Sequence, residues 1–214
     1  MLNRRGKNEK GDTLIEVLFA VTVFSLVVVL SLSLMNQGTS ASIRALQITL
    51  VRQEIDSQAE ALRFMSSSYV AAYYPGYAPS LTDGSTTPAE EYYKMTQAIG
   101  TGSVSAFGGE DQDACPAAPT GSFIVNARTA RYVPGAAALL QPAEAFAQTR
   151  YQDTTLQRSE GIWIEAVRSS QSSDPNQANT RYTDFHIRAC WDAPGAGAPM
   201  NLGTIVRLYE PVNS

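Results

Sequence analysis

The chain of 214 residues has few of the side chains that carry metal or nucleophile chemistry, with one histidine, His186, and two cysteines. That is too little for the common zinc and Cys–His arrangements. The acidic run 108–113 resembles a calcium loop only loosely, because its carboxylate spacing does not fit the EF-hand template. We therefore expect no catalytic residue, no metal site and no cofactor, with His186 on the solvent side or at an edge.

Positive charge is scarce beyond the first eleven residues. That segment holds four basic residues (Arg4, Arg5, Lys7 and Lys10) and one acid, Glu9. Taking these from the totals of 16 basic and 20 acidic residues leaves 12 and 19, a net charge of −7. A surface this acidic is repelled by phosphate backbones, so we expect no general nucleic-acid binding.

The apolar run Leu14–Met35 has 22 residues and a single charge, Glu16. As a helix it would be about 33 Å long, which matches a hydrocarbon core of about 30 Å. Its serine and threonine hydroxyls can bond to carbonyls of the preceding turn. Since four basic residues precede the run and none follows before Arg44, the positive-inside rule predicts a cytoplasmic N-terminus and an extracytoplasmic head.

Two other interpretations of this run are a secretory signal peptide and a plain single-pass anchor. A signal peptide would have a shorter apolar core followed by a small-residue cleavage site, and Asn36–Ser42 contains no clear site of that kind. A plain anchor gives no reason for Glu16, although a carboxylate in a spanning helix costs about 2.5–3.5 kcal/mol. We therefore expect Glu16 to have a partner.

Residues 10–18, KGDTLIEVL, resemble the prepilin motif of type IV pilins and of type II secretion and competence pseudopilins. In that family a membrane aspartyl peptidase cuts after the glycine and methylates the new amino terminus. The resemblance covers roughly residues 4–36. It implies a cut between Gly11 and Asp12, N-methylation of Asp12, and a role in assembly for Glu16. Asp12 departs from the family pattern, which usually has phenylalanine there.

The chemistry of these residues fits the implied roles. Gly11 has no side chain, so the scissile bond can enter a narrow peptidase site. Glu16 can pair with the amino terminus of a neighbouring subunit, and a buried pair requires both charges. Assembly would then depend on cleavage, while the Asp12 carboxylate could compete with Glu16 for the amine.

The resemblance implies a structural subunit of a type IV pilus, a secretion pseudopilus or a competence pilus. The unusual Asp12 and the absence of proline from the spanning helix favour a minor subunit over a major one. Its partners would be the prepilin peptidase, other pilin subunits, an inner-membrane assembly platform and the lipid bilayer. The subunit would be a single-pass inner-membrane protein before it enters the filament. Two alternatives stay open: a tip-mounted module that binds DNA or surfaces, and an anchored extracytoplasmic protein that never assembles.

The sequence divides into a leader (1–11), a transmembrane assembly helix (12–36), an amphipathic continuation (37–65) and a globular β-rich head (66–214). Apolar residues of the continuation recur at three- and four-residue steps, the spacing of one helical face. Gly38 marks a soft joint, so this periodicity fits one helix or two, and the resemblance implies one. The expected fold class is α+β and pilin-like, with the long N-terminal helix packed on a C-terminal antiparallel sheet.

Residues rich in β-branched and aromatic side chains predict the strands of the head. The expected strands are 161–168, 182–191 and 204–209, with a hairpin loop at 169–180. A further strand is expected within 122–133, a short helix at 136–147, and an irregular tyrosine-rich region from 69 to 93. An exported head would meet an oxidising compartment, which favours a Cys115–Cys190 disulfide over two buried free thiols.

Overall fold

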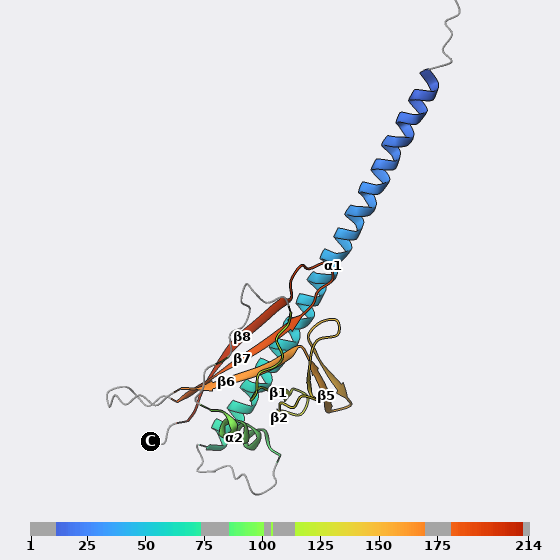
Figure 1. Ribbon diagram of the computed structural model, residues 1–214. Helices are drawn as coiled ribbons and strands as arrows, with labels where there is room; N and C mark the ends of the chain where they lie inside the picture. The colour runs from blue at the N-terminus through green and yellow to red at the C-terminus, as the bar shows by residue number, and fades with distance from the viewer. Residues whose placement is uncertain (1–11, 74–85, 101–103, 105–113, 170–180, 212–214) are drawn as a thin grey trace, which may run out of the picture. The chain divides into compact units, whose positions relative to one another are not determined.

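The computed structural model of the chain describes residues 12–73, 86–100, 104, 114–169 and 181–211 (Figure 1). The chain forms two compact units, Met1–Ile43 and Arg44–Ser214. The described part of the first unit is helical throughout. The second unit contains the hydrophobic core and every strand.

The helix α1 runs without a break from Asp12 to Tyr73. The expectation of one helix is confirmed, since Gly38 lies inside it and accepts a hydrogen bond from the Ser42 hydroxyl. The expected end at Met65 is wrong. Ser68, beyond that expected end, donates its hydroxyl to the Phe64 carbonyl and is helical.

The larger sheet has five strands in the order β2-β1-β6-β7-β8, and every neighbouring pair is antiparallel. The three expected C-terminal strands are present, although the last begins at Met200 rather than at Thr204. The region 122–133 holds a hairpin of two strands where one was expected. The bounds are β1 Phe123–Asn126, β2 Arg131–Pro134, β6 Ile162–Arg168, β7 Tyr182–Trp191 and β8 Met200–Tyr209.

One face of this sheet and the Val51–Met65 stretch of α1 form the core of the head. Phe185 and Ile187 of β7 belong to the same buried cluster as Leu62 of α1, and all three are 0% exposed. The other face of β7 carries polar side chains such as His186. This alternation confirms the expected antiparallel sheet with one face on the helix.

A second helix, α2 (Pro88–Ala98), occupies part of the region that was expected to be irregular. The hydroxyl of Thr87 accepts a hydrogen bond from the Glu90 N–H, and the Glu90 carboxylate accepts one from the Thr87 N–H. This capping box, followed by Pro88 at the first helical turn, starts the helix. The expected loop is therefore wrong over α2, and the buried Tyr92 is a core residue.

A smaller sheet has the order β3-β5-β4, with bounds β3 Leu140–Gln141, β4 Gln148–Gln152 and β5 Thr155–Glu160. The short helix expected at 136–147 is wrong. Leu139 and Leu140 donate their N–H groups to the Ala136 carbonyl and complete a single turn. Pro142 has no N–H to continue a helix, and β3 pairs with β5 instead.

Gly161 joins β5 of the smaller sheet to β6 of the larger one. Its φ is +65°, in the region that favours glycine. A Cβ built there would lie 2.4 Å from the Cys190 carbonyl oxygen and 2.7 Å from the Ala143 Cβ. No other residue fits this joint without movement of the backbone.

Candidate functional site

The N-terminal half of α1 presents an apolar surface that takes no part in the core. From Leu14 to Met35 its side chains are exposed, with Phe19 at 70% and Phe24 at 69%. Among the described residues, α1 is the one helix long and apolar enough to cross a membrane, and it lies near the N-terminus. Length and composition are therefore compatible with a single membrane span.

Three hydroxyl groups inside this run, those of Thr22, Ser25 and Ser31, are bonded to carbonyls of the same helix. Thr22 donates to the Phe19 carbonyl at 2.8 Å, and Ser25 donates to the Val21 carbonyl at the same distance. Ser31 bonds in the same way to the Val27 carbonyl, also at 2.8 Å. These hydroxyls are thus compatible with a lipid environment, because their protons stay bonded to the chain.

Glu16 is the one charged residue of the apolar run. Its side chain is exposed and makes no ion pair within the part of the chain that the structure describes. Asp12 is the first residue of α1, one helical turn before Glu16, while Gly11 lies outside the described residues.

The disulfide between Cys115 and Cys190 is formed, so the alternative of two free thiols is wrong. It ties the segment before β1 to the outer face of β7. Beside it is a cavity of about 150 Å³ whose lining includes Pro116, Leu140 and Trp163. The cavity lining contains no carboxylate, amine or histidine, so this site offers no acid–base chemistry.

His186 lies on the outer face of the sheet, half-buried, between Glu165 of β6 and Ile205 of β8. The expected solvent-side face is right, but β7 is an interior strand and not an edge. Burial first, and the Arg188 cation second, lower the pKa of His186 below its ordinary value. Glu165 is already engaged, because it accepts from Arg188 at 2.9 Å and from the Trp163 indole at 3.0 Å.

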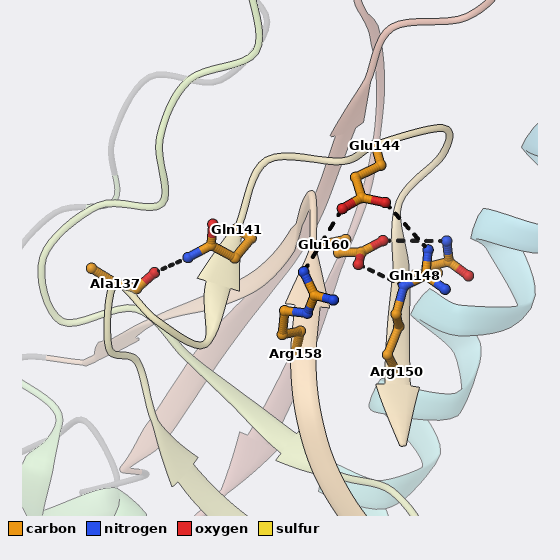
Figure 2. Close-up of polar contacts among 7 residues, drawn as sticks. All are labelled: Ala137, Gln141, Glu144, Gln148, Arg150, Arg158 and Glu160. Atoms are coloured by element: carbon orange, nitrogen blue, oxygen red, sulfur yellow. Dashed lines mark hydrogen bonds and ion pairs between the residues drawn. The ribbon is translucent and has the colours of Figure 1, made fainter. Parts of the chain in front are cut away.

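The smaller sheet holds a cluster of two arginines and two glutamates (Figure 2). The fully buried Glu160 carboxylate accepts a hydrogen bond from Arg150 Nε at 2.5 Å. Glu144 lies 3.9 Å from Arg150 and 3.7 Å from Arg158. Each charge has a partner of opposite sign, so the cluster holds β4 and β5 together and leaves no charge for a ligand.

No group of three or more His, Cys, Asp or Glu side chains suited to a metal occurs among the residues described, and the acidic run 108–113 lies outside them. The strongest functional feature is therefore the apolar half of α1 with its single carboxylate, Glu16. Comparisons with protein-family models, with curated proteins and with solved structures found no match to this chain. What the chain does is therefore inferred from its own residues.

Proposed function

We propose that this chain is a structural subunit, a minor pilin or pseudopilin, of a filament assembled from inner-membrane precursors. A prepilin peptidase cuts it after Gly11, and the new amino terminus at Asp12 is methylated. The subunit then enters the filament through the N-terminal half of α1. The observation that carries this proposal is Glu16, an exposed carboxylate on an otherwise apolar helix surface, with no ion-pair partner among the residues that the structure describes.

The energetic argument concerns what Glu16 gains in a filament. A lone carboxylate in a hydrocarbon core costs about 2.5–3.5 kcal/mol even on lenient scales. The amino terminus of a neighbouring subunit, freed at Asp12, supplies an opposite charge in the same apolar layer. A pair of this kind fixes the register between subunits, because removing either charge leaves the other buried and unpaired.

The exposed apolar side chains of α1 fit two successive environments. Those from Leu14 to Met35 are all exposed, so they are available to lipid and later to neighbouring helices. Close packing of helices then replaces lipid contacts at little cost, since both surroundings are apolar. Other pilin subunits and an inner-membrane assembly platform are the proposed partners.

Two observations support the proposed orientation, with the N-terminus in the cytoplasm and the head outside. Four basic residues precede the apolar run, and positive charge is retained on the cytoplasmic side. The head contains the Cys115–Cys190 disulfide, a bond that persists in oxidising compartments.

The test is mass spectrometry of the intact chain from cells with and without a prepilin peptidase. We expect a mature form that begins at Asp12, with or without one added methyl group, only when the peptidase is present. Gly11→Ala should stay uncut, while Gly6→Ala, a glycine inside the leader, should be cut as in the wild type. A working protein that keeps residues 1–11 would overturn the proposal.

A further inference from the structure

Among the described strands, β8 forms one edge of the five-stranded sheet, with β7 as its one neighbour in the sheet order. The two strands pair without a bulge from Tyr182 opposite Tyr209 to Trp191 opposite Met200. Glu210 donates its N–H to the Arg181 carbonyl at 2.8 Å. Since hydrogen-bonded pairs alternate in antiparallel sheets, the even-numbered residues of β8 bond to β7.

The odd-numbered residues of β8 therefore direct their N–H and C=O groups away from β7, toward the open edge. Their side chains lie on the outer face and are exposed, with Ile205 at 61% and Tyr209 at 58%. The set is Asn201, Gly203, Ile205, Arg207 and Tyr209. A row of backbone groups of this kind, without partners in the described part of the chain, is a template for another strand.

The usual protections of an edge strand are missing from β8. Between Met200 and Tyr209 it contains no proline and no lysine, and its one charged residue, Arg207, is neutralised by Asp184 through two hydrogen bonds of 2.7 Å. The opposite edge is protected. There β2 has four residues, and its Tyr132 N–H donates to the Glu91 carboxylate at 3.1 Å.

We propose that β8 pairs antiparallel with β8 of a second copy of this chain, about a two-fold axis at Ile205. This register opposes Ile205 to the partner's Ile205, Gly203 to the partner's Arg207, and Asn201 to the partner's Tyr209. Each of the five odd-numbered residues then lies opposite an odd-numbered residue of the partner, and each pair exchanges two backbone hydrogen bonds. A two-fold contact of this kind uses the same surface on both copies.

The side chains fit this register on both faces. On the outer face the Arg207 side chains do not face each other, because each lies opposite a glycine; a shift that opposed them would place like charges together. On the inner face the half-buried Leu202 lies opposite the partner's Leu208, so apolar surface left open by the single sheet is covered. Two five-stranded sheets thereby become one continuous sheet.

The pairing goes beyond the proposed filament role and does not depend on it. It uses neither Gly11 nor Glu16, and a two-fold contact closes after two copies. A failure of N-terminal processing would leave it untouched. Conversely, a head that remains monomeric would not contradict the proposed filament role.

The test measures the mass of the full chain in detergent by light scattering, with Ile205→Pro and Ile205→Thr as a matched pair. Proline removes the N–H at the open edge but breaks no bond to β7, so the fold should survive. Threonine keeps both the N–H and the β-branch. We expect dimers for the wild type and Ile205→Thr, and a dimer at least tenfold weaker for Ile205→Pro with an unchanged circular dichroism spectrum.

A charge swap tests the register and does not rely on proline. Because Ile205 opposes itself, Ile205→Lys and Ile205→Glu should each be monomeric alone and should form mixed dimers when combined. A wild-type chain that is monomeric, a dimer that Ile205→Pro does not weaken, or a mixture that fails to associate would each overturn the proposal.

Discussion

Trp191, the last residue of β7, donates its indole N–H to the side-chain carbonyl of Gln47 on α1 at 3.2 Å. Both side chains are buried. The Gln47 amide in turn donates to the Ala145 carbonyl at 3.3 Å, so one glutamine ties the helix to β7 and to the loop between β3 and β4.

Replacing Gln47 by alanine should leave the Trp191 indole and the Ala145 carbonyl without partners. An unsatisfied buried polar group costs about 1–3 kcal/mol. We expect Gln47→Ala to lower the free energy of unfolding by about 2 kcal/mol and Tm by about 4–8 °C, measured by circular dichroism. Gln53→Ala, at an exposed position of the same helix, is the control and should leave Tm unchanged.

Reduction of the Cys115–Cys190 bond should destabilise the head. The bond closes a loop with a sequence separation of 75, which corresponds to about 4 kcal/mol in the chain-entropy model. We expect the reduced chain to melt about 8–16 °C lower than the oxidised chain. A double Cys115→Ala, Cys190→Ala variant should have the Tm of the reduced chain, and added reductant should not change that Tm. Equal Tm values, with bond cleavage verified by thiol alkylation, would contradict this.

Alkaline pH should destabilise the head through Tyr92. Burial, partly offset by the Ser66 hydroxyl, raises the pKa of Tyr92 to about 12. Because this pKa is raised on folding, its contribution is fully present below pH 10 and is lost as the pH rises from 10 to 12. Tyr92→Phe should therefore lose less stability than the wild type between pH 9 and 12, as measured by urea unfolding. Parallel losses would exclude Tyr92 as the source.

Glu16 should be needed for assembly and not for processing. Glu16→Val removes the carboxylate but leaves Gly11 and the apolar helix intact, so the chain should still be cut. We expect at least a tenfold loss from the sheared filament fraction, quantified by immunoblot. Thr22→Val is the matched control, since the Thr22 hydroxyl already bonds within its own helix and should not affect assembly. Normal filament incorporation of Glu16→Val would exclude the proposed pairing.

The long helix and the C-terminal strands could be predicted because their hydrophobic periods are long and regular. In β7 the apolar Phe185 and Ile187 alternate with the polar Asp184 and His186, the pattern of a strand with one buried face. The N-terminal site could be named only from a short motif, and the structure adds to it the exposure of Glu16.

Elements that depend on local hydrogen bonds were harder to predict. The hairpin between β1 and β2 turns where the Asn126 side chain accepts from the Arg128 N–H and where Ala130 takes a φ of 51°, without any glycine to signal it. The helix α2 lies in a tyrosine-rich region that was expected to be irregular. Its start is nevertheless marked in the sequence, because Thr87 and Glu90 have the spacing of a capping box. The open edge of β8 follows from strand order, which no local pattern specifies.

At position 161, where the chain passes from β5 of the smaller sheet to β6 of the larger one, only glycine is expected to be tolerated. If residues 155–168 were randomised and the library were selected for display of a folded head, glycine should be recovered at 161 in nearly every survivor. An exposed neighbour such as Gln157 should tolerate many different residues. Position 161, which connects the two sheets, would thus tolerate the least variation, although glycine contributes no side chain at all.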